Sequence, residues 1–135
     1  MSAPKAYLEH VAFYVRDIRW HIRFFEDVFG MTMREIDGTA EAPRQYWTLG
    51  GMQFIHMPDF AGPEGRLGHL GIMCEDVEAA LAAARRYDVR PMPQGENWLR
   101  LPDGLAIEFI QAKPARCVAQ ALAIDPRTEA SNDDR

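Results

Sequence analysis

The sequence has only two cysteines among its 135 residues, and it has no long run of apolar residues. Cys74 and Cys117 are too few for a disulfide framework and do not have zinc-finger spacing, so we expect two free thiols. No window approaches the roughly 18 consecutive apolar residues of a membrane span, and the first residues lack the apolar core of a signal peptide. We therefore predict a cytoplasmic protein without a membrane partner.

Positive charge is also in short supply. Lys and Arg number 15 against 20 Asp and Glu, which gives a net charge of -5. The basic residues are scattered along the sequence, which argues against nucleic acid as the main partner. An anionic small substrate would need a local positive charge, such as a metal. With 47% hydrophobic and 26% charged residues, the composition is that of one ordinary globular domain.

A short stretch near the N-terminus is repeated later in the chain. Residues 9–17 match residues 68–76, so that His10 corresponds to His69 at an offset of 59 residues. In each copy the alternation of side chains predicts a strand with the histidine on one face. A small residue two positions later, Ala12 or Gly71, leaves a hollow on that face. Two half-units that each present a histidine into a hollow indicate one shared site.

The rest of the sequence predicts two βαβββ modules. Asp17 is a suitable N-cap for a helix over 18–29, which Gly30 would end in a left-handed conformation, and Asp76 is a suitable cap for a second helix. We expect strands at 31–36, 46–49 and 52–57 in the first module, strands at 89–92, 98–101 and 105–111 in the second, and a short helix within 114–123. The expected organisation is an α+β domain with module one at about 6–57, a linker at 58–66, module two at about 67–112, and a C-terminal extension and tail at 113–135. Within that extension, residues 128–135 have the composition of a disordered tail.

The first helix carries more apolar surface than one sheet face requires. One stripe runs from Ile18 through Phe25 to Phe29, and Trp20 and Phe24 form a second. Either a thick core or a subunit contact would explain the second stripe.

Glu108 lies in an otherwise apolar predicted strand, where an unpaired carboxylate would be costly. If its face joins the two histidine faces, Glu108 meets His10 and His69. Two imidazoles and one carboxylate around a cavity suit a divalent first-row metal with free coordination positions. Taken singly, each is more often an ordinary strand residue, but their matching positions in a duplicated unit favour a metal site.

His56 is a fourth candidate ligand whose direction depends on the strand register. Aligning the turn residue Gly51 with Asp103 puts His56 at the place of Glu108 and points it inward. An alignment shifted by one residue would turn His56 outward.

Other polar and aromatic side chains near the hollow could touch a substrate, and packing explains them equally well: Tyr46, Trp47, Trp98 and Arg100. His21, on the first helix, is expected to be a surface residue rather than a ligand.

These features resemble the vicinal oxygen chelate superfamily, which includes glyoxalase I, methylmalonyl-CoA epimerase, fosfomycin-resistance thioltransferases, extradiol dioxygenases and bleomycin-binding proteins. The matching residues lie between about 7 and 112: His10 with Asp17, the helix ending at 24–30, His69 with Asp76, and residues 101–109. The resemblance implies paired βαβββ modules in a half-barrel sheet around a divalent metal, often in a homodimer. Carried over residue by residue, it implies His10, His69 and Glu108 as metal ligands and His56 as the fourth.

The resemblance leaves three function classes open. A metal-dependent lyase or isomerase, acting on a small substrate chelated through two adjacent oxygens, is favoured; the expected ion is Fe, Mn, Ni or Zn, and Glu108 or a displaced water would serve as the base. An Fe(II) dioxygenase of the extradiol type is the second, although such chains are mostly much longer. A non-catalytic antibiotic-binding protein is the third, and the full set of ligand residues argues against it. Fosfomycin modification is disfavoured, because residues 93–97 lack the Lys- and Ser-containing potassium loop of the fosfomycin-resistance enzymes.

Overall fold

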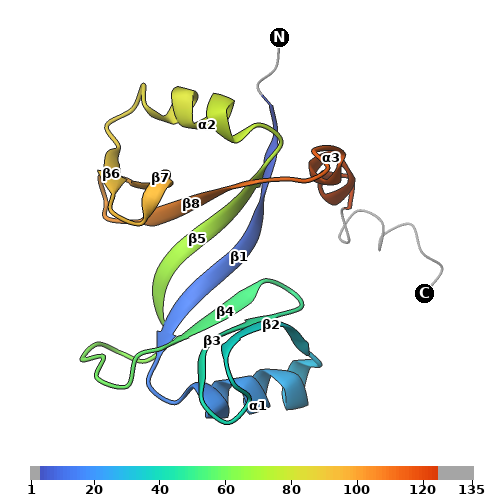
Figure 1. The fold of residues 1–135 in the computed structure, drawn as a ribbon, viewed down its shortest axis with the longest axis vertical. Helices are drawn as coiled ribbons and strands as arrows, with labels where there is room; N and C mark the ends of the chain where they lie inside the picture. Colours follow the sequence, from blue (N-terminus) through green and yellow to red (C-terminus); the bar gives the residue numbers. More distant parts are fainter. Residues whose placement is uncertain (1–3, 125–135) are drawn as a thin grey trace, which may run out of the picture.

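The computed structural model describes residues 4–124, which form one eight-stranded sheet and three helices (Figure 1). In chain order the elements are β1 (Ala6–Val15), α1 (Ile18–Phe29), β2 (Met33–Gly38), β3 (Pro43–Thr48), β4 (Met52–His56), β5 (Arg66–Cys74), α2 (Val77–Ala84), β6 (Arg90–Met92), β7 (Gly95–Arg100), β8 (Ala106–Gln111) and α3 (Arg116–Leu122). This order confirms an α+β fold built from two consecutive βαβββ modules. The tail expected at 128–135 lies outside the described residues.

The two modules meet where β1 and β5 run antiparallel at the centre of the sheet (Figure 1). The strand order is β2-β3-β4-β1-β5-β8-β7-β6, so the same pattern is read outward from the centre in both directions. In each module the last strand joins the first in parallel, β4 with β1 and β8 with β5. The sheet therefore has an approximate twofold symmetry about the β1–β5 seam.

Both module helices begin after an aspartate that caps the helix N-terminus, as the sequence predicts. The Asp17 carboxylate accepts a hydrogen bond of 3.1 Å from the backbone N–H of Trp20, and the Asp76 carboxylate accepts one of 3.0 Å from Ala79. Gly30 adopts φ 68° and its N–H bonds back to the carbonyl of Glu26, which ends α1. These caps satisfy backbone groups that a helix end otherwise leaves unpaired.

One apolar cluster lies between α1 and the first half of the sheet, and another lies between α2 and the second half. The first contains Val15, Ile18, Tyr46 and Phe54, and the second contains Cys74, Val77, Leu81 and Leu99. Tyr46, which packing or substrate contact could have explained, is a core residue with 5% exposure. Burial raises the pKa of the Cys74 thiol, and both cysteines are free.

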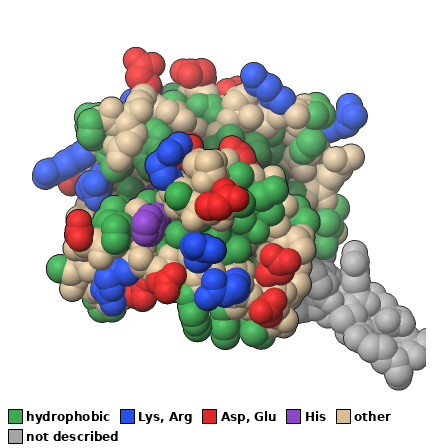
Figure 2. Space-filling model, turned by 60° about the horizontal axis from the view of Figure 1, so that its bottom comes forward, with side chains coloured by type: hydrophobic (Ala, Val, Ile, Leu, Met, Phe, Trp, Pro, Cys, Tyr) green, Lys and Arg blue, Asp and Glu red, His purple; other side chains and the backbone are tan. Residues whose placement is uncertain are grey.

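One side of α1 presents apolar side chains to solvent, beside the exposed charged residues Arg23 and Asp27. Figure 2 brings the α1 end of the molecule forward and shows hydrophobic side chains at its surface among charged ones. Trp20 and Phe24 stack with ring centroids 5.0 Å apart and remain 47% and 37% exposed. Phe29, expected on the buried stripe, is 59% exposed because the helix ends beyond the edge of the first cluster. The thick-core explanation is therefore wrong for this face.

No helix between residues 4 and 124 has the length and apolar character needed to cross a membrane.

Candidate metal centre

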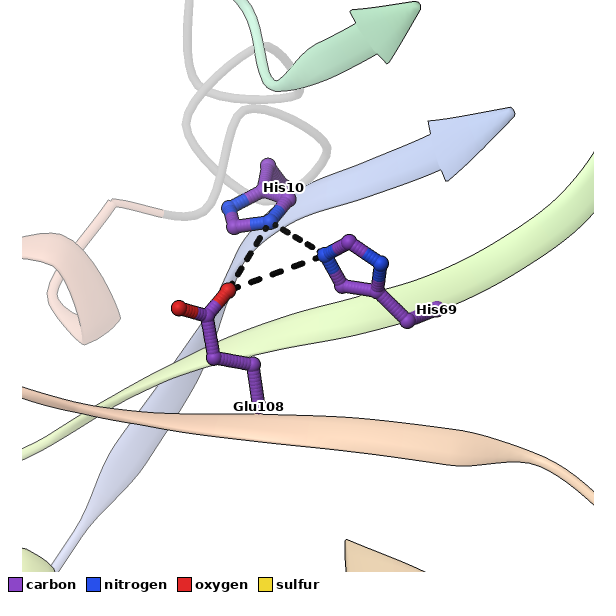
Figure 3. A group of neighbouring side chains, drawn as sticks. All are labelled: His10, His69 and Glu108. Atoms are coloured by element: carbon purple, nitrogen blue, oxygen red, sulfur yellow. Dashed lines mark hydrogen bonds and ion pairs between the residues drawn. The ribbon is translucent and has the colours of Figure 1, made fainter. Parts of the chain in front are cut away.

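His10, His69 and Glu108 converge from three adjacent strands, β1, β5 and β8 (Figure 3). The Nε2 atoms of the two histidines lie 3.1 Å apart, and the Oε1 atom of Glu108 lies 3.5 Å from His10 Nε2 and 3.6 Å from His69 Nε2. Both imidazoles are buried, with 4% and 8% exposure, whereas the Glu108 side chain is 27% exposed. The three donor atoms therefore form a small triangle with one partly open side.

The strand pairing at the seam explains this convergence. His10 lies opposite Gly71 on β5, and His69 lies opposite Ala12 on β1. A Cβ atom on Gly71 would fall 2.2 Å from the ring of His10, so the imidazole occupies the space that the missing side chain leaves. The small residue two positions after each histidine thus makes room for the other module's histidine.

Gln53 is a site residue that the sequence analysis missed. The parallel pairings place Ala12 beside Gln53 and the equivalent Gly71 beside Glu108, so Gln53 is the first module's counterpart of Glu108. It lines the same cavity as the triad and is 3% exposed. Its Nε2 donates a 2.6 Å hydrogen bond to Gln45, while its buried Oε1 has no partner within residues 4–124.

A signal for this position was present in the sequence. Residues 53–55 read Gln-Phe-Ile and residues 108–110 read Glu-Phe-Ile, an offset of 55 residues. The prediction aligned the hairpin turns instead. Trp98 and Glu108 are four residues further apart in the sequence than the equivalent pair Trp47 and Gln53, so an alignment of the turns misplaces the strand that follows.

The structure does not bring His56 into the site. His56 is exposed at the end of β4 and lines a different hollow, with Arg16 and Arg44. On β4 the residues that face the cavity are Gln53 and Ile55, so the side chain of His56 leaves the opposite face. The register that pointed His56 inward is wrong. In the structure the equivalent positions of β4 and β8 differ by 55 residues, as Gln53 and Glu108 do, and neither alignment of the turns used this offset.

The triad opens into a polar cavity of about 570 Å³. Trp47 and Trp98 lie on its two sides at equivalent positions, since Trp47 pairs with Gln53 and Trp98 pairs with Glu108. Arg100 also lines the cavity and donates to the carbonyl of Gly104. His21 lies on α1, outside the cavity, where it packs on Trp20 as expected of a non-ligand.

A family model described as the Glyoxalase/Bleomycin resistance protein/Dioxygenase superfamily matches residues 7–109. This range runs from the second residue of β1 to the fourth residue of β8. The chain belongs to this superfamily. Among curated proteins no sequence matches the chain significantly.

Solved structures of other proteins share the fold at low identity. The 2,3-dioxygenase LapB from Pseudomonas sp. KL28 superposes with a TM-score of 0.57 at 20% identity, over 78% of this chain and 42% of the dioxygenase. A methylmalonyl-CoA epimerase variant of Streptomyces coelicolor, in complex with 2-nitronate-propionyl-CoA, gives 0.55 at 16% identity, over 82% and 96% of the two chains. The methylmalonyl-CoA epimerase of Mycobacterium tuberculosis gives 0.55 at 18%, over 87% and 91%. The present chain therefore spans less than half of the length of the dioxygenase and nearly all of the length of each epimerase.

Adding a methyl group at Gly71 should dismantle the triad. In Gly71→Ala the new Cβ would overlap the imidazole of His10, which must leave its position or push β5 away. We expect a loss of stability of about 1–3 kcal/mol and the loss of metal binding, measured by urea denaturation and by titration with a divalent metal. Gly68→Ala is the control on the same strand, because the atoms nearest its Cβ would be the ring of Tyr14 at 3.2 Å and the carbonyl oxygen of Ala12 at 3.3 Å rather than the ring of His10. Equal metal affinity in Gly71→Ala and wild type would contradict the prediction.

Proposed function

We propose that this protein is a metal-dependent enzyme that moves a proton at a carbon next to a carbonyl group, as a lyase or isomerase does. Its substrate would be a small molecule that presents two adjacent oxygens to the metal. The proposed ligands are His10, His69 and Glu108, with Gln53 as the fourth, and the ion is Fe, Mn, Ni or Zn. The observation that carries the proposal is a group of two buried histidines and a half-buried glutamate that shares its cavity with an amide oxygen unpaired within residues 4–124.

The spacing of the triad fits one ion. Ligand atoms held about 2.1 Å from a metal lie about 3.0 Å apart at right angles and about 3.4 Å apart in a tetrahedron. The observed separations run from 3.1 to 3.6 Å. Imidazole and carboxylate together are ligands of first-row divalent metals.

The unpaired oxygen of Gln53 supports a fourth ligand. A buried amide oxygen without a hydrogen bond costs free energy, and native proteins rarely leave one unsatisfied. Gln53 occupies the position that corresponds to Glu108, and its amide nitrogen is already used by Gln45. Its Oε1 is therefore the atom left to bind an ion.

The chemistry follows from the ligands and from Glu108. A divalent ion held here would act as a Lewis acid, polarising a substrate carbonyl and stabilising the negative charge left when a proton is removed. Glu108 turns one carboxylate oxygen to the histidines, and its other oxygen points away from both imidazoles (Figure 3). That second oxygen can accept the proton from a substrate carbon and return it, with Trp47 and Trp98 flanking the substrate.

An Fe(II) dioxygenase is the second candidate. With His56 outside the site, the ligand set other than Gln53 is two histidines and one carboxylate, the arrangement that non-haem Fe(II) oxygenases use. Gln53 separates the lyase or isomerase from the dioxygenase. If Gln53 binds the metal, it occupies a coordination position that a dioxygenase would need for dioxygen and a chelating substrate.

The reaction class is tested on protein purified without a His-tag. We expect stoichiometric divalent metal by elemental analysis, and incorporation of solvent deuterium next to the carbonyl in a panel of hydroxyketones, 2-oxoacids and acyl thioesters. Glu108→Ala should lose the metal and the exchange while keeping the fold, checked by circular dichroism. Oxygen uptake with catechols and Fe(II), without deuterium exchange, would instead establish the dioxygenase. Stoichiometric metal in Glu108→Ala would place the site elsewhere.

The role of Gln53 is tested against His56 as a matched control on the same strand. We expect Gln53→Ala to weaken metal binding at least about tenfold, measured by competition with a chelator above the histidine pKa range. His56→Ala should leave metal affinity unchanged and shift stability by less than about 0.5 kcal/mol. The reverse pattern would restore His56 as the ligand.

We also propose that the protein is a homodimer formed through the uncovered face of α1. Trp20, Phe24, Val28 and Phe29 are all more than one-third exposed there, and a second copy would remove them from water. Sedimentation at micromolar concentration should give twice the 15.4 kDa chain mass. Trp20→Glu should produce monomers, whereas Tyr87→Glu, at an exposed aromatic residue away from α1, should not. A monomeric wild type would reject the interface.

A further inference from the structure

A bulge in β1 turns two neighbouring residues, Glu9 and His10, toward the same cavity. Leu8 pairs with Ile72 and His10 with Gly71, so Glu9 is an extra residue with no partner on β5. Adjacent residues of a regular strand point to opposite faces, but a bulge re-aims one of them. Both Glu9 and His10 accordingly line the cavity.

The glycine turn before β4 supports this bulge. The carbonyl of Gly51 accepts a 2.7 Å hydrogen bond from the backbone N–H of Val11. Gly51 has φ +91°, and a Cβ on it would lie 3.0 Å from the carbonyl oxygen of Glu9. A residue with a side chain would therefore be strained there and would crowd the bulged residue.

Both carboxylate oxygens of Glu9 have partners. Oε1 lies at a hydrogen-bond distance of 2.6 Å from Nδ1 of His10, and Oε2 pairs with the guanidinium of Arg34 on β2. The hydrogen bond from His10, aided by Arg34, lowers the pKa of Glu9 although burial opposes this. The Glu9 side chain is only 13% exposed, so these partners keep a nearly buried charge satisfied.

This contact determines which nitrogen of His10 is free. When Nδ1–H donates to Glu9, Nε2 carries the lone pair, and Nε2 is the atom that faces His69 and Glu108. A carboxylate that accepts the second ring N–H of a ligand histidine also makes the imidazole a better electron donor.

The second module orients its histidine in a different way. Gly68 stands before His69, at the position that corresponds to Glu9, and a Cβ there would already lie 3.2 Å from the ring of Tyr14. Glycine has no side chain, so no carboxylate reaches His69 from this position. Its ring instead packs edge-on against Trp98, with centroids 4.7 Å apart.

We propose that Glu9, anchored by Arg34, is a positioning residue that holds His10 in the Nδ1–H tautomer and directs Nε2 to the metal. The Arg34–Glu9–His10 chain thereby links edge strand β2 to the ligand on β1. The proposal rests on the metal site proposed above for its effect on affinity, but the tautomer is a property of the metal-free protein.

The first measurement is the histidine tautomer in metal-free, ¹⁵N-labelled protein near pH 8, where imidazoles are generally neutral. Long-range ¹H–¹⁵N spectra should show His10 as the Nδ1–H tautomer in wild type. Glu9→Gln keeps an acceptor oxygen and should retain this tautomer, whereas Glu9→Ala should lose it in favour of the Nε2–H form. An Nε2–H tautomer of His10 in wild type would overturn the proposal.

The second measurement is metal affinity by chelator competition. Glu9→Ala should weaken binding by about 10- to 100-fold, and Glu9→Gln and Arg34→Met should each weaken it less. Glu35→Ala is the charge control, because Glu35 is the neighbour of Arg34 on β2 and within residues 4–124 no ion pair or hydrogen bond joins it to a histidine. Wild-type affinity in Glu9→Ala would overturn the proposal. A wild type that binds no divalent metal would refute the proposed function instead, and the tautomer spectra would still decide the role of Glu9.

Discussion

The antiparallel pairing of β1 with β5 is the contact on which the site depends. It sets each histidine across from a small residue of the other strand, His10 across from Gly71 and His69 across from Ala12. A slip of one residue along this seam would leave the two imidazoles on opposite faces of the sheet. The helices and apolar clusters hold each module together, but the seam decides whether the two modules make one site.

Three pairs of equivalent residues surround the cavity: His10 with His69, Gln53 with Glu108, and Trp47 with Trp98. The symmetry ends in the residues around these pairs. Glu9 corresponds to Gly68, so one histidine is held by a carboxylate and the other by an indole. The two halves thus share a framework, while each histidine has its own surroundings.

The sequence was sufficient for the modules, the helix bounds and three residues of the candidate site. Asp17 and Gly30 mark the ends of α1 by local chemistry, and the His10–His69 repeat needs no alignment gap. His56 was misplaced because side-chain direction in a strand reverses with each residue, and the two hairpins differ in length. Glu9 was invisible to strand periodicity, since a bulge breaks the alternation from which the prediction was made.

The pairing of Gln53 with Glu108 has a consequence for the charge of the site. Two copies of the first module would offer two neutral amides, and two copies of the second would offer two carboxylates, so a strictly symmetric ligand set carries an even charge. The joined modules supply one of each, so the proposed ligand set would carry a net charge of −1 with neutral histidines. A divalent cation would then keep one unit of positive charge with which to attract an anionic substrate, a balance that two identical modules could not provide.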